Sequence, residues 1–298
     1  MSFDPSGLVV YVDGEYVDAR GAHVSIFDHG LLYGDGVFEG LRLFDGSLFR
    51  PYDHLARLER SARSIGLELP LEPDGLLDVI CQVIARSSLR EAHVRPILTR
   101  GFGAPGLDPA RCERPSLYVA AYPMAPLLGS EPIRVLVSSV VRKAPRSLGA
   151  HVKSLNYLDA IVAKRQAAAA GMPEAIMLDM LGAVAECTAA NLFLVLDGVL
   201  VTPTTRAALP GITRRTVLEL AAEQGIAVEE RDVWPMELYV AEAMFATGSA
   251  AGIVPIAEVD GVALATAGNP VLAALSEGYR ARTRDPRYLV AVAERVAP

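Results

Sequence analysis

Lys153 is the residue of this sequence whose type and setting best match a chemical role. Only three of the 28 Lys and Arg residues are lysines, namely Lys143, Lys153 and Lys164. An arginine stays protonated in a protein and forms no imine, whereas a lysine can lose its proton and attack a carbonyl. In a chain that otherwise uses arginine, Lys153 is therefore a candidate nucleophile. The alternative interpretation is a solvated surface lysine.

Two turns rich in small residues have the composition of an anion site. The segment Pro210–Val217 predicts the start of a helix, with Thr213 as its N-cap and Gly211 allowing close approach of the backbone. The segment Thr247–Ala251 predicts a turn that offers backbone N–H groups and the hydroxyl of Ser249. An ordinary capped helix explains the first segment as well, so neither segment identifies a phosphate site alone.

Glu186 supplies the third chemical group. It lies among small and apolar residues, where a carboxylate needs a cation or a hydrogen bond; an exposed hairpin glutamate is the alternative. A lysine that forms imines, a phosphate-binding turn and an acid are together what pyridoxal phosphate requires. The lysine bonds the cofactor, the turn binds its phosphate and the acid keeps its pyridine nitrogen protonated. The sequence therefore predicts a pyridoxal phosphate enzyme.

Length and composition narrow the class of protein. With 298 residues and 51% hydrophobic content, the chain has enough material for two domains with buried cores. The net charge of −7 and the lack of a basic block argue against nucleic acid. Three cysteines without CxxC spacing indicate neither a disulfide framework nor a zinc site and favour a reducing cytoplasm. Neither a signal peptide nor a membrane span is expected, and no metal is predicted.

The predicted elements indicate an α+β protein with a small N-terminal domain over residues 1–123, a proline-rich linker over 124–132 and a larger domain over 133–298. Strands of the small domain are expected at Leu8–Val12, Glu15–Val17, Val37–Phe44, Ser47–Phe49, His93–Thr99 and Ser116–Ala121, and helices at 51–65 and Glu72–Leu89. Strands of the larger domain are expected at Ile133–Val141, Ala175–Leu178, Ala183–Ala185, Leu192–Val195 and Val199–Val201, and helices at Leu155–Ala170 and Thr213–Glu223. Asp-Gly pairs at 13, 45, 197 and 260 predict hairpin turns.

Five segments, in this order, resemble a known family. They are Phe27–Arg42, His54–Leu58, Lys153–Leu158, Glu186–Asn191 and Leu209–Arg214. The sequence is thereby similar to the fold-type IV (class IV) pyridoxal phosphate aminotransferases, most of all to their branched-chain amino acid aminotransferases. The resemblance runs from about Val10 to about Val259. It implies the two-domain fold of D-amino acid aminotransferases, with the cofactor bound where the domains meet.

The resemblance implies a role for each residue of the cofactor site. Lys153 bonds the cofactor and moves the proton, Tyr157 donates to the phenolic oxygen, and Glu186 pairs with the pyridine nitrogen. The remaining cofactor-binding residues are implied to be Arg57, Ser249 and the backbone of Gly211, Ile212 and Thr213 at the phosphate, with Leu209 packed on the ring. Substrate residues are implied to be Tyr33, Phe38, Gly40, Arg42, Arg95, Ser249 and Ala250.

The implied reaction is ping-pong transamination of L-branched-chain amino acids (Leu, Ile, Val) with 2-oxoglutarate, by a homodimer or larger homo-oligomer. One position departs from the family: branched-chain enzymes usually carry Tyr where this chain has His93, two residues before Arg95. This departure leaves room for relaxed substrate specificity, including primary (R)-amines. The alternatives on the same fold are a D-amino acid or (R)-amine transaminase and an aminodeoxychorismate lyase, and a non-catalytic cofactor-binding protein is a third alternative. Arg95 and the loop after it favour the branched-chain enzyme.

Overall fold

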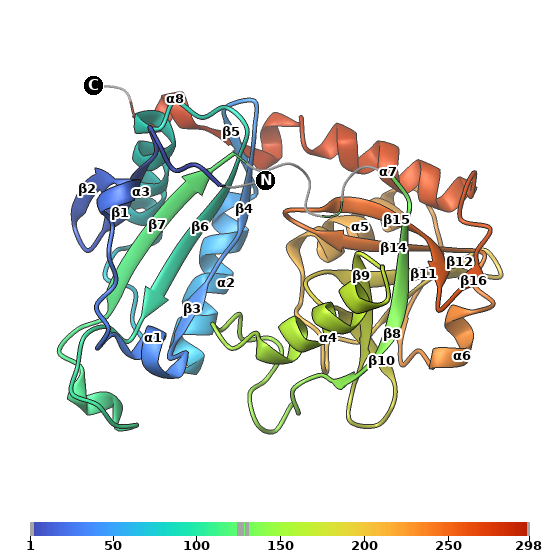
Figure 1. Ribbon diagram of the computed structural model, residues 1–298. Coiled ribbons are helices and arrows are strands. Elements are labelled where there is room, and N and C mark those ends of the chain that lie inside the picture. The colour runs from blue at the N-terminus through green and yellow to red at the C-terminus, as the bar shows by residue number, and fades with distance from the viewer. Residues whose placement is uncertain (1–2, 124–127, 129–130, 297–298) are drawn as a thin grey trace. The chain divides into compact units, whose positions relative to one another are not determined.

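Two mainly antiparallel sheets, each flanked by helices, make up the α+β architecture of the chain (Figure 1). The computed structural model describes residues 3–123, 128 and 131–296. It divides into two compact units that are not contiguous in sequence. Unit 1 comprises Met1–Met124, Val152–Asn156 and Thr283–Pro298, and unit 2 comprises Ala125–His151 and Tyr157–Arg282. Much of the predicted linker, residues 124–127 and 129–130, lies outside the described residues.

The short segment Val152–Asn156 differs from the expected continuous domains, because it belongs to unit 1 although its neighbours in sequence belong to unit 2. Backbone hydrogen bonds explain this. Phe38 N donates to Lys153 O at 3.0 Å, and Leu155 N donates to Gly36 O at 2.9 Å. The candidate nucleophile is thus fixed to a strand more than a hundred residues earlier in the chain.

The sheet of unit 1 has eight strands in the order β17-β5-β4-β6-β7-β1-β2, with β3 paired to β6. The strands are β1 (Val9–Val12), β2 (Glu15–Asp18), β3 (Gly36–Phe38), β4 (Leu41–Phe44), β5 (Ser47–Phe49), β6 (Ala92–Thr99), β7 (Ser116–Tyr122) and β17 (Leu289–Ala291). The helices are α1 (His29–Tyr33), α2 (Pro51–Ser64), α3 (Pro73–Arg86) and α8 (Val292–Arg295).

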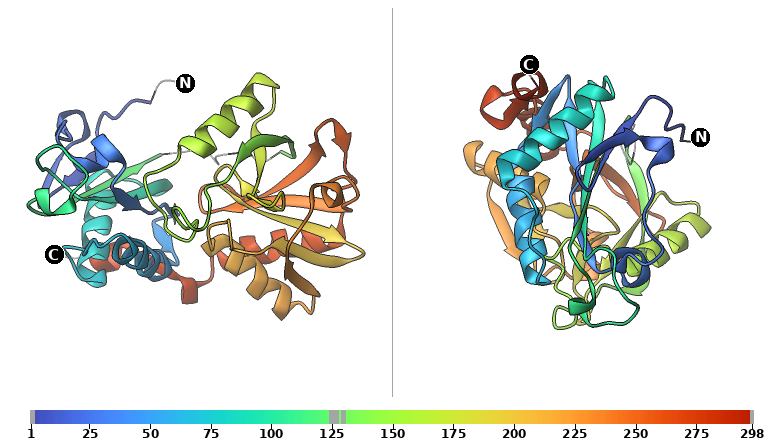
Figure 2. Two further views of the ribbon diagram at one scale, coloured as in Figure 1. Left: turned by 90° about the horizontal axis from the view of Figure 1, so that it is seen from below. Right: turned by 90° about the vertical axis from the view of Figure 1, so that its left-hand side faces the viewer.

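Helices α2 and α3 pack side by side against one face of this sheet (Figures 1 and 2). Both begin with proline in the first turn, where its missing N–H costs nothing. Leu55, Leu58 and Ala62 recur at helical spacing on α2 and are buried in the core of the unit. Because α2 also carries His54 and Arg57, this packing fixes where those two polar side chains lie.

The strand expected over Val37–Phe44 is two strands, because β3 ends at Phe38 and β4 begins at Leu41. The chain turns at Glu39 and Gly40. The Glu39 side chain is fully buried against α2, and a Cβ at Gly40 would lie 2.7 Å from the His93 ring. The sequence pattern predicts one continuous strand over Val37–Phe44. Burial of the Glu39 carboxylate against α2 instead divides this segment into β3 and β4.

The sheet of unit 2 has nine strands in the order β10-β9-β8-β15-β14-β11-β12-β13, with β16 paired to β15. The strands are β8 (Ile133–Val141), β9 (Glu174–Leu178), β10 (Val184–Cys187), β11 (Asn191–Leu196), β12 (Val199–Pro203), β13 (Val228–Arg231), β14 (Ala243–Gly248), β15 (Gly252–Val259) and β16 (Val262–Ala263). The helices are α4 (Leu158–Ala169), α5 (Ile212–Glu223), α6 (Pro235–Leu238) and α7 (Pro270–Arg282). Helix α4 begins three residues later than expected, since Leu155 and Asn156 belong to the segment bound to β3.

The four Asp-Gly pairs form hairpin turns with the aspartate and the glycine both at positive φ, as at Asp13 (47°) and Gly14 (110°). This is the backbone of a type I′ turn, whose twist matches that of the flanking strands. The sequence prediction of these turns is confirmed. Within the described part of the chain, no helix is long and apolar enough to span a membrane.

Candidate active site

Lys153 lies beside the segment that was expected to line the substrate pocket. Its backbone N–H donates to Ser61 Oγ of α2 at 3.1 Å, and its carbonyl oxygen accepts from Phe38 N. The ammonium Nζ stands 4.6 Å from the centroid of the Phe38 ring. The half-buried lysine is thus held at both backbone groups, and its amine faces an aromatic ring.

Strand β6 places His93 and Arg95 on one face of the sheet, because side chains two residues apart share a face. The Arg95 guanidinium carbon lies 4.8 Å from the centroid of the same Phe38 ring that Lys153 faces. Among the described residues, neither Arg95 Nε nor His93 Nδ1 has a hydrogen-bond partner, although both atoms are buried. Buried polar atoms without a hydrogen-bond partner are costly, and Arg95 adds a positive charge, so this face suits an anionic ligand such as a carboxylate.

His93 is uncharged at neutral pH. Burial lowers its pKa, and the positive charges of Arg95, Lys153 and Arg42 lower it further, to about 3. The imidazole is 4% exposed and packs against Gly40 and edge-on against Tyr122. A neutral imidazole therefore occupies the position where the resemblance led us to expect a tyrosine.

Arg57 is buried on α2 in a network that the sequence did not predict. Its Nε and Nη2 donate to the two oxygens of Glu39, at 2.6 and 2.9 Å, and His54 Nδ1 lies 2.7 Å from Glu39 Oε2. Burial opposes ionisation of Glu39, but the charge of Arg57 and the hydrogen bonds from Arg57 and His54 outweigh it and hold its pKa well below the usual range. Glu39 is thus a buried carboxylate between two α2 side chains.

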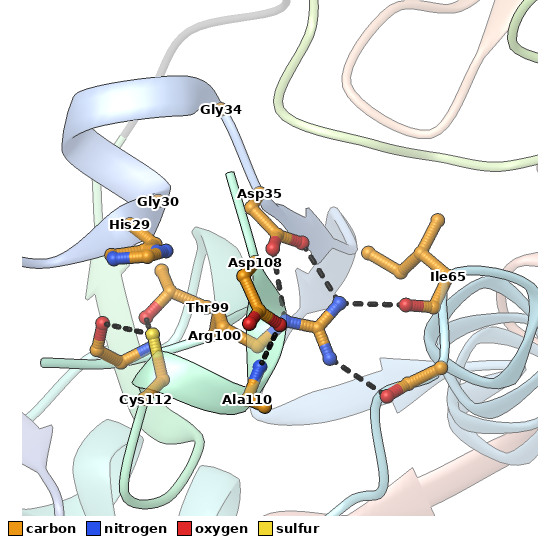
Figure 3. Close-up of polar contacts among 12 residues, drawn as sticks. His29, Gly30, Gly34, Asp35, Ile65, Thr99, Arg100, Asp108, Ala110 and Cys112 are labelled. Atoms are coloured by element: carbon orange, nitrogen blue, oxygen red, sulfur yellow. Dashed lines mark hydrogen bonds and ion pairs between the residues drawn. The ribbon is translucent and has the colours of Figure 1, made fainter. Parts of the chain in front are cut away.

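Tyr33, at the end of α1, accepts a hydrogen bond from Gly106 N at 2.9 Å. The loop after α1 is held in place by Arg100, which bridges Asp35 and the end of α2 (Figure 3). Its Nε donates to Asp35 Oδ2 at 2.9 Å, and its two terminal nitrogens donate to the carbonyl oxygens of Ile65 (2.6 Å) and Gly66 (2.7 Å). Arg100 is a positioning contact that motif reading missed.

The remaining substrate candidate in unit 1 is Arg42 on β4. It donates to Glu91 at 3.3 Å, and its guanidinium carbon lies 5.4 Å from the Phe44 ring. Its charge also contributes to the lowered pKa of His93. In unit 1 the structure therefore groups Lys153, Phe38, Gly40, Arg95 and His93, whereas Arg57 belongs to the Glu39 network.

Glu186 is the centre of a buried network in unit 2. Arg142 Nη2 donates to its Oε1 at 2.5 Å, while Leu209 N and Asn191 Nδ2 donate to its Oε2 at 3.1 and 3.2 Å. The register of β10 against β9 shifts between Val184 and Glu186, and such a bulge re-aims the side chains after it. The expected cationic partner of Glu186 is thus Arg142, which the sequence analysis did not identify.

Arg142 also joins Glu186 to the start of α4. Its Nη1 donates to Asp159 Oδ2 at 3.1 Å. Tyr157 is the N-cap residue of α4, and Lys143 Nζ lies 5.5 Å from the centroid of its ring. The only sequence signal for Arg142 was its position at the end of a predicted strand, directly before Lys143.

Helix α5 begins at Ile212 with Gly211 as its N-cap, so the prediction of Thr213 as N-cap is wrong. Gly211 has an extended backbone, and its carbonyl oxygen already accepts from Arg215 N, which makes Thr213 the second helical residue. A Cβ at position 211 would lie 2.0 Å from Asn191 Oδ1, so any other residue would displace the buried Asn191 amide. The N–H groups of Ile212 and Thr213 lie in the first turn of α5. N–H groups in the first turn have no hydrogen-bond acceptor within the helix, so they can bind a ligand.

The turn after β14 lies close to the start of α5. Thr247 of β14 pairs with Asn191 of β11, and the Asn191 side chain in turn lies against Gly211. Thr247 is 1% exposed, and its hydroxyl has no hydrogen-bond partner among the residues described. Ser249 and Ala250 form the tip of the turn, which Ala251 N closes by donating to Gly248 O at 3.1 Å. Unit 2 thus brings Glu186, Leu209, Gly211 and this turn into one connected network through Asn191.

Comparisons with known proteins agree with this arrangement. Residues 36–259 match the family described as Amino-transferase class IV. A relative from Methanocaldococcus jannaschii is 47% identical over 255 residues, which are 85% of this chain and 88% of that protein.

Two solved structures share the fold over nearly the whole chain. The branched-chain amino acid aminotransferase of Escherichia coli has a TM-score of 0.91 at 34% identity, covering 96% of this chain and 99% of that one. The enzyme of the same name from Thermobaculum terrenum, solved in its PLP-bound holo-form, has a TM-score of 0.86 at 28% identity, covering 97% and 99%. The chain belongs to the class IV aminotransferase family.

Proposed function

We propose that this protein is a pyridoxal phosphate-dependent aminotransferase that exchanges the amino group between L-branched-chain amino acids and 2-oxoglutarate by a ping-pong mechanism. One observation carries the proposal. Lys153 Nζ and the Arg95 guanidinium lie 4.6 and 4.8 Å from the centroid of one aromatic ring, that of Phe38. An amine-exchanging group and a carboxylate-binding group beside an apolar ring suit an α-amino acid with an apolar side chain.

The side chains present fit the cofactor. When bound, pyridoxal phosphate supplies an aldehyde that condenses with amines and a ring that withdraws electrons from the substrate Cα. Unit 2 offers an oriented carboxylate at Glu186, the N–H groups in the first turn of α5 and the buried Thr247 hydroxyl. These are the acid and the anion-binding groups that the cofactor needs.

We assign the binding groups as follows. Lys153 bonds the aldehyde carbon, Tyr157 donates to the phenolic oxygen, and Glu186 pairs with the pyridine nitrogen. Arg57, Ser249 and the backbone N–H groups of Ile212 and Thr213 bind the phosphate, Gly211 allows its approach, and Leu209 packs on the ring.

The catalytic step assigned to this chain is a proton transfer. The Lys153 amine would take the proton from the substrate Cα and return it to the cofactor carbon that carries the exchanged amino group. Arg95 binds the substrate carboxylate together with Ser249 and the backbone at Ala250. The remaining substrate groups assigned are Tyr33, Phe38, Gly40 and Arg42 around the substrate side chain.

The test is a spectroscopic titration of the purified holoenzyme. L-Leucine should remove the visible band of lysine-bound pyridoxal phosphate and produce the pyridoxamine phosphate band, and 2-oxoglutarate should reverse the change. A band that responds to D-alanine or to (R)-1-phenylethylamine but not to L-leucine would overturn the substrate assignment. A Lys153→Ala variant that keeps full activity would overturn the catalytic one.

We also propose that the protein is at least a homodimer. Unit 1 exposes several large apolar side chains on α1 and the neighbouring loops, namely Ile26, Phe27, Leu31, Leu32, Phe102 and Leu107. A cavity of 330 Å³ with mainly apolar walls opens beside them on the sheet, lined among others by Val10, Val24, Leu31, Ile97 and Ala120. Several exposed apolar side chains beside an apolar cavity are typical of a protein–protein interface.

A second copy of the chain is the occupant we assign to this surface. Sedimentation velocity should show a dimer or larger species, and Leu31→Glu should shift it towards monomer. Val240→Glu, at an equally exposed apolar position of unit 2, is the control and should leave the oligomer intact. A wild-type monomer at micromolar concentration would contradict the proposal.

We propose a cytoplasmic location, which is supported by three cysteines that form no disulfide, Cys81, Cys112 and Cys187. Burial raises the pKa of Cys81 to about 11, so its thiol stays protonated and unreactive. Fractionation of cells that produce the protein tests this location, and recovery with secreted proteins would contradict it.

A further inference from the structure

We propose that Glu39 is a positioning residue that holds the Arg57 guanidinium in the orientation needed to bind the cofactor phosphate. The inference rests on the proposed function, because it concerns the cofactor site assigned there. It adds a residue that the motifs do not single out and states which form of the cofactor depends on it most. Three contacts of Glu39 carry the argument.

The first contact is the two-point ion pair with Arg57. Both Glu39 oxygens are used, at 2.6 Å from Nε and 2.9 Å from Nη2. A planar guanidinium bound along its Nε–Nη2 edge has its plane and direction fixed, so its outer edge points away from the carboxylate. Without that pair, the flexible arginine side chain would sample several rotamers.

The second contact is His54, one turn before Arg57 on α2. Because Glu39 is ionised, His54 Nδ1 must be the donor across the 2.7 Å contact, which assigns the tautomer. Burial lowers the pKa of His54 despite the nearby carboxylate, so the ring is neutral. Glu39 is therefore held from two points of the same helix and cannot turn with Arg57.

The third contact ties the network to the substrate face. Glu39 stands between Phe38 and Gly40, and Gly40 N lies 3.2 Å from Glu39 Oε2. Phe38 is the ring that both Lys153 and Arg95 face. All three members of the network are at most 4% exposed, so water does not screen their charges. The same carboxylate thus fixes the phosphate-side arginine and the backbone that carries the pocket ring.

The consequence differs between the two cofactor forms. Pyridoxal phosphate is retained through its bond to Lys153 as well as through its phosphate contacts. Pyridoxamine phosphate has no bond to the lysine, so its retention depends on the phosphate and ring contacts alone. Disorder of Arg57 should therefore weaken binding of the pyridoxamine form more than of the pyridoxal form.

The experiment measures the equilibrium affinity of the apoenzyme for each cofactor form by fluorescence titration. Glu39→Gln keeps the size of the side chain but removes its charge and turns N–H groups towards Arg57 and His54. Loss of a charged hydrogen-bonding partner should raise the Kd for pyridoxamine phosphate by about ten- to a hundredfold. The Kd for pyridoxal phosphate should rise less, and Glu39→Asp, which keeps the charge, should recover part of the loss.

Asp179→Asn is the matched control. Asp179 is also a buried carboxylate paired with an arginine, Arg206 at 2.8 Å, but it lies in the hairpin between β9 and β10. This variant should lose stability and keep the wild-type affinity for pyridoxamine phosphate. If Glu39→Gln does not fold, His54→Gln and Glu39→Asp decide the question by the same titration.

The outcomes separate the two proposals. A wild-type apoenzyme that binds neither cofactor form overturns the proposed function. A wild-type apoenzyme that binds both, with a folded Glu39→Gln that binds pyridoxamine phosphate equally well, overturns the positioning role alone. A loss of the same size for both cofactor forms, or for Asp179→Asn, also overturns it.

Discussion

At the scale of the residue, Arg142 decides whether Glu186 remains an oriented carboxylate. Both side chains are buried, and Arg142 joins Glu186 to Asp159. We expect Arg142→Met to lower the free energy of unfolding by about 3–5 kcal/mol, because it leaves two carboxylates without their cation. Urea denaturation measures this. Arg134→Met, at an exposed position of the same strand, is the control and should change stability by less than about 0.5 kcal/mol.

We expect the buried imidazole of His93 to make the stability of the folded protein depend on pH. Its pKa is about 3 in the folded protein and 6.5 in a free peptide, because burial and the charges of Arg95, Lys153 and Arg42 disfavour its protonation. Between these values the unfolded chain binds a proton that the folded chain does not. The contribution of His93 to stability is therefore complete above pH 6.5 and falls steadily as the pH drops towards 3.

The variant His93→Gln lacks this titration. Urea denaturation of both proteins at about pH 7 and about pH 5 should show a smaller loss of stability for the variant. An equal loss in both proteins would mean that His93 is protonated in the folded state. Because the imidazole is neutral at working pH, the pH dependence of activity should not report its titration above about pH 6.

At the scale of the element, α1 shows how a helix of five residues can be stable. Such a helix has too few hydrogen bonds to persist alone. Asp28 caps it by accepting from Gly30 N at 2.7 Å, and its other oxygen accepts from Thr99 Oγ1 (2.8 Å) and Tyr118 Oη (3.1 Å). The capping residue is thus anchored to strands β6 and β7.

We expect Asp28→Ala to lower the free energy of unfolding by about 1–3 kcal/mol, through loss of the cap and of the buried acceptor. The KM for L-leucine should rise, because Tyr33 ends this helix. Asp108→Ala removes a similar cap, to Ala110 N at 3.0 Å, in an exposed loop, and should cost less than Asp28→Ala. Equal losses of stability in the two variants would contradict the anchoring role of Asp28.

Elements defined by local patterns could be predicted from the sequence. Helix α2 follows from Pro51, its apolar spacing and Gly66, and the hairpins follow from their Asp-Gly pairs. The break between β3 and β4 could not be predicted, since it depends on burial of Glu39 against a helix that begins twelve residues later.

Lys153 and Glu186 could be found by residue type and motif. Arg142 could not, because its partner Glu186 is 44 residues away and only the folded sheet brings them together.

At the scale of the whole molecule, the chain passes between the two units four times, after residues 124, 151, 156 and 282. The predicted linker is therefore only one of the connections. Unit 1 is completed by the C-terminal residues: β17 pairs with β5, and Arg295 donates to Asp74 and Asp78 of α3. These contacts join residues more than two hundred positions apart, which local sequence patterns do not reveal.

This topology predicts how the N-terminal part behaves when it is produced alone. A fragment of residues 1–123 lacks β17, α8 and the segment that pairs with β3, so it leaves one strand edge of β5 and the part of α3 that contacts α8 uncovered. We expect such a fragment to aggregate or to unfold without cooperativity in urea, followed by circular dichroism. Joining residues 283–296 to it through a flexible linker should restore a cooperative transition, because β17 again pairs with β5 and buried Val292 again packs in the core. If the fragment alone unfolds as cooperatively, and at the same urea concentration, as the joined form, the C-terminal residues contribute no stability to unit 1.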